Sequence, residues 1–137
     1  MSVRHVNPPG LAAPVMDLYA QVAVAEPGQR LVAIAGQVGV DPRGDLVGAG
    51  DLRAQAEQAF RNLRTALEAV GGTAADLLKY TIHVVDSSPA LIGPRRRRAR
   101  AAFDGHLPLV PSTWIGVAAL GLPEWLVEVD GLAAITP

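Results

Sequence analysis

The most regular hydrophobic pattern in the chain lies between Asp51 and Gly72. Apolar residues recur there at intervals of three and four, from Leu52 to Val70, and the charged residues lie largely off that stripe. Asp51 can cap the start of a helix, and the pair Gly71 and Gly72 can end it. The pattern predicts an amphipathic helix of about twenty residues with one face buried.

Two apolar runs in the first third of the chain predict strands. They cover residues 18–25 and 31–40 and flank a Pro-Gly turn in the sequence EPGQR, which predicts a β-hairpin. Asp41 opens a second turn, because proline follows it directly and glycine stands three positions after it.

The rest of the chain predicts further strands and one more helix. The run Leu78–Asp86 is rich in β-branched residues and predicts a strand. A second helix is expected from Pro94, which suits a first helical turn, to about Asp104. Residues 109–117 and 126–135 predict the last two strands. This order favours an α+β fold in which two helices pack on one face of a single sheet.

The length and composition of the chain predict one domain that associates with itself. A chain of 137 residues favours a single domain, residues 1–137. Half of the residues are hydrophobic and only 18% are charged. Such a chain has more apolar surface than one domain is expected to bury. We therefore expect a neighbouring copy to cover the face of the sheet that carries no helix.

Charge and cysteine content exclude several classes of function. The net charge of −1 favours neither a nucleic acid nor a membrane as partner. The absence of cysteine excludes disulfides, thiolate nucleophiles and cysteine-ligated metals, and it fits the cytoplasm. The first ten residues lack the apolar stretch of a secretory signal. The uncharged run from Gly105 to Pro123 contains prolines and glycines that favour a strand with turns over a membrane helix.

An arginine run, Arg95 to Arg98 with Arg100, is the most conspicuous charged feature. It could bind phosphate, form a solvated helix face with one or two ion pairs, or line a ligand cleft. Four consecutive helical residues point in all directions and no aromatic residues alternate with them, so the solvated face is favoured over a nucleic-acid site. The scattered histidines 5, 83 and 106 match no metal-binding spacing, and His83 is expected to be a core or interface residue.

Two strands place polar residues where a ligand could bind. Glu128 and Asp130 are two apart on the last strand and share a face. They either form a polar rim or supply a carboxylate that orients water or accepts a proton. Alternation puts Thr113 and Ile115 on one face of the preceding strand, opposite Trp114.

The chain resembles the RidA/YjgF family through four stretches in the family's order. They are YAQVAVA, AGQVGVDPRGDLVG, QAEQAFRNLRTALEAVGGTAADLLKYTIHVVD and VPSTWIGVAALGLPEWLVEVDGLAAI. Together they cover most of the chain between Leu18 and Ile135. The resemblance implies a chorismate-mutase-like α+β fold and a homotrimer with clefts between subunits. It also implies hydrolysis of reactive enamines and imines to 2-oxo acids and ammonia, without metal or other cofactor.

The resemblance also assigns roles to single residues. The family's cleft tyrosine falls on Tyr19, its Gly-Gln pair begins at Gly36, and its cleft asparagine falls on Arg96. Its water-positioning glutamate falls on Glu128. The arginine that grips the substrate carboxylate in the family is replaced by Thr113, which supplies one hydrogen bond and no charge.

These assignments predict a cytoplasmic homotrimer that binds a small polar metabolite in its clefts. Tyr19, Gly36, Arg96, Thr113 and Ile115 are expected to contact that ligand, and Glu128 is the expected catalytic residue. Deamination of simple 2-imino acids is not expected, because the arginine is missing. A trimer that binds a ligand without catalysis is the main alternative. RNA cleavage has little support from the charge or the histidines.

Overall fold

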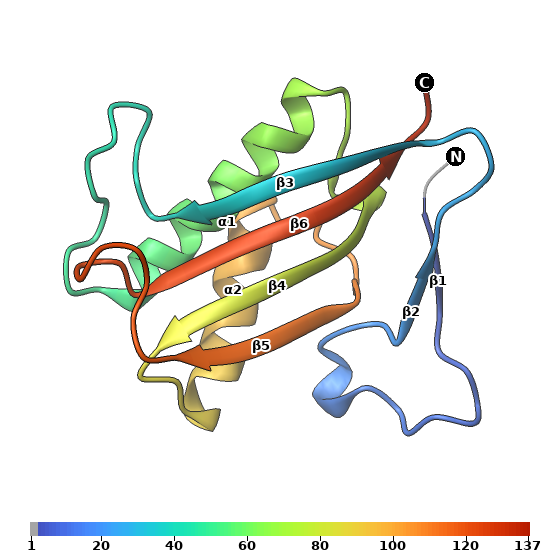
Figure 1. Cartoon of the computed structure of the whole chain (residues 1–137). Helices are drawn as coiled ribbons and strands as arrows, with labels where there is room; N and C mark the ends of the chain where they lie inside the picture. The colour runs from blue at the N-terminus through green and yellow to red at the C-terminus, as the bar shows by residue number, and fades with distance from the viewer. Residues whose placement is uncertain (1–2) are drawn as a thin grey trace.

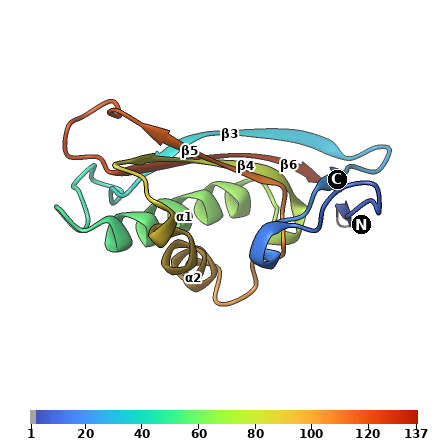
Figure 2. The ribbon, with the colours of Figure 1, turned by 90° about the horizontal axis from the view of Figure 1, so that it is seen from below.

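The protein consists of a sheet covered by helices on one face. The computed structural model describes residues 3–137, apart from the side chains of Pro89 and of residues 92–96. The four-stranded sheet has the order β3 (Arg30–Val38), β6 (Val127–Ile135), β4 (Leu77–Val85) and β5 (Ser112–Val117). Figures 1 and 2 show α1 (Leu52–Ala69) and α2 (Ile92–Ala102) on the same side of it. The predicted α+β fold with two helices on one face is confirmed.

The sheet is mixed, and its last strand in sequence lies at its centre. β6 pairs antiparallel with β3 on one side and with β4 on the other, whereas β5 pairs parallel with β4 at the edge. Three short 3₁₀ helices, Val15–Asp17, Ala74–Asp76 and Pro89–Leu91, interrupt the connections.

The predicted hairpin between residues 18–25 and 31–40 is wrong. β2 (Val22–Val24) pairs with β1 (Arg4–Val6) in a separate two-stranded sheet, and β3 pairs with β6. The turn between β2 and β3 exists. However, β2 has only three residues and can form few interstrand hydrogen bonds, whereas β3 and β6 are each nine residues long. The distant strand therefore offers β3 many more backbone hydrogen bonds than its neighbour in sequence.

Helix α1 begins and ends where the sequence predicts. The Asp51 carboxylate accepts hydrogen bonds from the backbone N–H groups of Arg53 and Ala54, at 3.0 and 3.2 Å. At the other end Gly71 adopts a φ of 86°, which glycine tolerates without steric cost. The second helix begins two residues before the expected Pro94.

The core lies between the helices and the sheet. Phe60, Leu63 and Leu67 of α1 are fully buried, and the ring of Phe60 meets that of Tyr80 edge to face at 5.6 Å. Burying one such side chain stabilises the fold by roughly 1.5–3 kcal/mol. The strands contribute residues from one face only, among them Val84, Val127, Val129 and Ala133.

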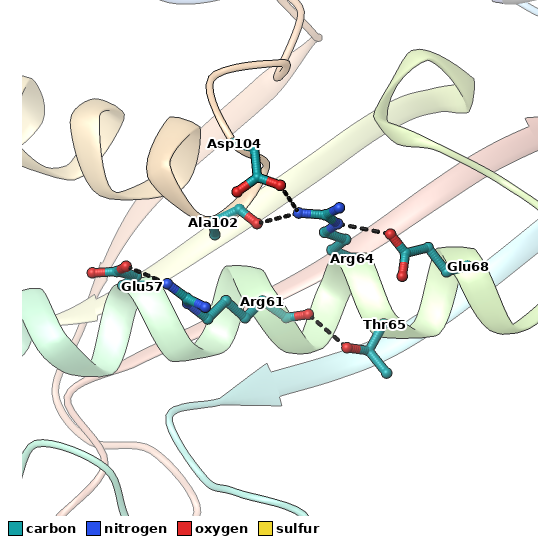
Figure 3. A network of polar contacts seen from close by, with 7 residues as sticks. All are labelled: Glu57, Arg61, Arg64, Thr65, Glu68, Ala102 and Asp104. Atoms are coloured by element: carbon teal, nitrogen blue, oxygen red, sulfur yellow. Dashed lines mark hydrogen bonds and ion pairs between the residues drawn. The ribbon is translucent and has the colours of Figure 1, made fainter.

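The two helices are joined by an arginine of α1. Arg64 donates from Nε to Glu68 at 2.7 Å and from Nη1 to Asp104 at 2.8 Å (Figure 3). Its Nη1 also donates to the carbonyl oxygen of Ala102, the last residue of α2, at 3.3 Å. These contacts hold the pKa of Asp104 below its ordinary value, mainly through the hydrogen bond from Arg64.

The opposite face of the sheet is open in the single chain. Figure 2 shows both helices on the other side of the sheet. Several apolar side chains on the open face are exposed, including Leu31 at 73%, Leu132 at 42% and Ile115 at 40%. In the part of the chain that the structure describes, no helix is long and apolar enough to cross a membrane.

Candidate functional site

Helix α1 positions the strand that carries Glu128 through a buried glutamine. The side chain of Gln55 is fully buried. Its Nε2 donates to the carbonyl oxygens of Gly48 and Glu124, at 3.1 and 3.2 Å, and its Oε1 accepts from the N–H of Leu126 at 2.9 Å. Leu126 directly precedes β6, so Gln55 fixes the start of the strand two residues before Glu128.

The same helix also fixes the end of β3. Asn62 donates from Nδ2 to the carbonyl oxygens of Val38 and Val40, both at 2.9 Å. Gln58 donates to the Oδ1 of Asn62 at 2.9 Å and holds its amide in that orientation. Because β3 carries Gly36, one helix sets the relative position of the two strands on which the site is built.

Gly36 leaves the space that the Glu128 carboxylate occupies. The pairing of β3 with β6 is irregular between Ile34 and Gln37, and Gly36 lies in that irregularity. A Cβ atom at position 36 would overlap Oε1 of Glu128. The structure thus brings these two predicted site residues together, with the carboxylate lying over the glycine backbone.

His83 lies beside Glu128 on the open face. The two residues are register partners on β4 and β6, and His83 in turn pairs with Ile115 of β5. The Nδ1 atom of His83 is 3.4 Å from the backbone oxygen of Glu128. The sequence predicts a core or interface position for His83. Alternation places His83 on the same face of its strand as Thr81, but only the pairing of β4 with β6 brings it beside Glu128.

The next row of side chains contains Asp130, Thr81 and Thr113. Thr81 is the register partner of both others, and its N–H donates to Oδ1 of Asp130 at 3.2 Å. A shallow hollow of about 380 Å³ next to this row is lined in part by Lys79, Asp130 and Leu132. Glu128 and Asp130 do share a face, as predicted.

A family model described as "Endoribonuclease L-PSP" matches residues 11–135. The chain belongs to this family, RidA/YjgF. A crystal structure from Yersinia pestis, described as a protein of unknown function of the conserved Rid protein family, YyfB, is 34% identical with a TM-score of 0.88. It covers 98% of this chain and 100% of its own.

Two further relatives carry functional or family names. RidA from the Antarctic bacterium Psychrobacter sp. PAMC 21119 is 30% identical with a TM-score of 0.62, over 85% of this chain and 88% of that one. The rat (Rattus norvegicus) protein named 2-iminobutanoate/2-iminopropanoate deaminase is 26% identical over 98% of this chain and 93% of its own length. The resemblance to the RidA/YjgF family is confirmed.

Four of the six predicted site residues lie on the open face of one chain. Gly36, Glu128, Thr113 and Ile115 belong to three strands of the sheet, β3, β6 and β5. Tyr19 follows the 3₁₀ helix Val15–Asp17 and lies outside the four-stranded sheet. Within the sheet, Glu128 is the register partner of His83 and of Val38, and its side chain lies over Gly36.

The side chain of Arg96 lies outside the described residues. Elsewhere in the same run, Arg98 forms an ion pair with Glu57 of α1 at 3.3 Å, and Arg100 donates to the carbonyl oxygen of Gly105. Among the described residues, no group of three histidines, cysteines or acidic residues could hold a metal ion. The described residues of the open face include carboxylates, an imidazole, hydroxyls and the ammonium group of Lys79.

Proposed function

We propose that this RidA/YjgF member hydrolyses a small enamine or imine that carries no carboxylate, in clefts between the subunits of a homotrimer. The observation that carries the proposal is the placement of the Glu128 carboxylate on the open face, over Gly36 and beside His83, in a row next to Thr113. The names of the deaminase relatives support the reaction class.

In this reaction Glu128 orients and deprotonates water. An enamine first takes a proton at carbon, loses one from nitrogen and becomes the imine. Water then adds to the C=N carbon, and the proton taken by Glu128 passes to nitrogen. As the C–N bond of this tetrahedral intermediate breaks, nitrogen takes a second proton, the hydroxyl proton passes to Glu128 and the C=O bond forms. Imine and water thus give a carbonyl compound and ammonia, with no change in oxidation state. A positioned carboxylate is suited to both proton transfers.

His83 is the second proton carrier in this scheme. Its Nδ1 lies within 3.4 Å of the carbonyl oxygen of Glu128, to which an N–H at that atom would donate. The neutral ring then keeps Nε2 as an acceptor. A proton at Nε2 can be handed to the departing nitrogen, so that Glu128 and His83 divide the acid and base steps.

The charges near Thr113 disfavour a carboxylate substrate. Thr113 is neutral, and the row to which it belongs ends in the carboxylate of Asp130. A substrate carboxylate placed there would meet the like charge of Asp130. It would also lack the bidentate guanidinium partner that fixes such a group, since Lys79, which lines the same hollow as Asp130, offers an ammonium group instead. A neutral or cationic imine avoids that repulsion.

The homotrimer is proposed because the site is open and incomplete in one chain. The exposed side chains of Leu31, Ile115 and Leu132 lie around the polar rows and need cover. A neighbouring subunit would cover them and turn the open face into a cleft. Tyr19, which lies outside the four-stranded sheet of its own chain, would then contact the ligand of a neighbour.

The test is ammonia release from imines generated in situ by amine oxidation. We expect faster turnover of an imine derived from a simple alkylamine than of 2-iminobutanoate. Glu128→Gln should lower kcat by about 10²- to 10⁴-fold, as expected for loss of a general base. Thr113→Arg should raise activity on 2-iminobutanoate, whereas the matched neutral variant Thr113→Gln should not.

Robust turnover of 2-iminobutanoate by the unaltered protein would contradict the proposed substrate class. If no imine yields ammonia and Thr113→Arg gains nothing, the second candidate is favoured, a homotrimer that binds a small metabolite without catalysis. The replacement of the family's arginine by Thr113 is the observation in favour of that candidate.

A further inference from the structure

A hollow lined by arginines lies on the helix layer, away from the open face of the sheet. It measures about 330 Å³ and is lined by Arg53 of α1 and by Arg97, Arg98 and Ala101 of α2. A second hollow of about 570 Å³ shares Arg53 and Arg98 and extends along the first turn of α1. Among the described residues, the lining of the first hollow contains three guanidinium groups and no carboxylate.

The positive charge at this place is only partly compensated. Glu57 is bound to Arg61 at 2.9 Å and to Arg98 at 3.3 Å, so one carboxylate serves two arginines. Its pKa is lowered, mainly by the hydrogen bond from Arg61. The described ion pairs include none with Arg53 or Arg97, whose side chains are exposed.

The helix geometry adds to the excess of positive charge. Arg53 lies in the first turn of α1, where the peptide dipoles leave a partial positive charge. The first turns of α1 and α2 contain no acidic residue. Asp51, the cap of α1, already accepts two backbone N–H groups there. Cations in this position repel each other and the helix terminus, and a bound anion would relieve both repulsions.

We propose that this hollow is a binding site for the phosphate groups of a small oligophosphate. Guanidinium groups bind phosphate oxygens through paired hydrogen bonds. An anion with several charges can engage three arginines at once, whereas a carboxylate carries only one negative charge. The described lining holds no aromatic ring on which a base could stack, so recognition rests on the phosphates.

The site is independent of the proposed hydrolase chemistry. It lies on the helices, whereas Glu128 and His83 lie on the opposite face of the sheet. Loss of activity in Glu128→Gln should therefore leave oligophosphate affinity unchanged. The failure of either proposal can thus be recognised without reference to the other.

The test is isothermal titration calorimetry of the full chain with inorganic triphosphate. We expect saturable binding of one triphosphate per chain, weakened by added salt because exposed charges are screened. Arg53→Gln and Arg97→Gln should each weaken binding by about tenfold, as expected for loss of one charge-assisted contact. Arg100→Gln is the matched control, because Arg100 lies on α2 but does not line the hollow.

Three results would overturn the proposal. They are the absence of saturable triphosphate binding, equal losses in Arg100→Gln and in the two lining variants, and binding only of long polyanions such as single-stranded RNA. Circular dichroism of each variant checks that the helices remain folded. A variant that lost helix content would be replaced by the lysine variant at the same position, Arg53→Lys or Arg97→Lys. Lysine keeps the charge but loses the paired hydrogen bonds, so binding should weaken, though less than in the glutamine variants.

Discussion

The contact between Gly36 and Glu128 shows how a single missing side chain can set the position of a carboxylate. Glycine at position 36 has no positive φ, so its backbone does not demand glycine. What demands it is the Glu128 side chain that lies over it. The function of Gly36 is therefore to leave space and not to provide conformational freedom.

Gly36→Ala should separate activity from stability. The added methyl group overlaps the flexible end of Glu128, which can swing away at little cost to the fold. Displacing a catalytic group by about 1 Å can lower the rate by about 10²-fold. We expect a loss of this size in kcat/KM for imine hydrolysis with a nearly unchanged Tm.

The control for this prediction is Gly10→Ala. A Cβ at position 10 would meet nothing within 4 Å, and Gly10 has no positive φ. Both activity and Tm should stay as they are. Full activity in Gly36→Ala would show that the position of the carboxylate does not limit the reaction.

The sequence predicts which residues share a face but not which residues meet across strands. Alternation alone pairs Glu128 with Asp130 and Thr113 with Ile115. The proximity of His83 to Glu128 depends on β4 lying next to β6, a pairing between residues far apart in the chain. Local periodicity holds no information about which strand lies next to β4, so the sequence predicts only a core or interface position for His83.

At the scale of elements, the two helices are joined by ion pairs that depend on pH. Asp104 has a lowered pKa in the folded protein, first because of the hydrogen bond from Arg64, and Glu57 has a lowered pKa first because of Arg61. For a carboxyl group with a lowered folded pKa, the stabilisation is fully present above the unfolded value. It is lost as the pH falls through the folded value.

We therefore expect the urea midpoint to fall as the pH decreases below the ordinary carboxyl values of 4.5 for Glu57 and 3.8 for Asp104. Asp104→Asn should lower the midpoint at pH 7 slightly and flatten this dependence, because the pairs are exposed and individually weak. Asp45→Asn, an exposed aspartate outside both helices, should leave the pH dependence unchanged. An equal effect in both variants would contradict the role of the Arg64 contacts.

Elements were predictable where the signal is local. Helix α1 carries its own cap, periodic stripe and glycine stop, and its bounds agree with the prediction. The prediction of the hairpin failed because a turn sequence indicates a change of chain direction but not which strand pairs with which. β1, with only three residues, gave no pattern that could reveal it as the partner of β2.

At the scale of the whole molecule, the open face of the sheet predicts self-association. Leu132 is on the central strand of the sheet and 42% exposed in the single chain. Leu132→Lys should place a charge in the proposed subunit interface and lower the mass measured by light scattering toward that of one chain. Burying an unpaired charge is costly, so the shift should occur at micromolar protein concentration.

The matched control for Leu132→Lys is Val70→Lys. Val70 is also exposed, at 40%, but it lies at the end of α1 on the helix layer. Its replacement should leave the mass unchanged. A single-chain mass for the unaltered protein would contradict the proposed homotrimer and its clefts.

The central place of β6 has a consequence for how the protein is made. β6 is synthesised after the other three strands of the sheet, yet it lies between β3 and β4, so β3 has no partner in the sheet until β6 has been made. Helix α1 can form early, but its apolar stripe must wait for the sheet that covers it. Pairing of residues so far apart in sequence is slow. The apolar surface of the nascent chain therefore stays exposed until β6, the strand that carries Glu128, has been made. Chaperones would matter most in the period just before that.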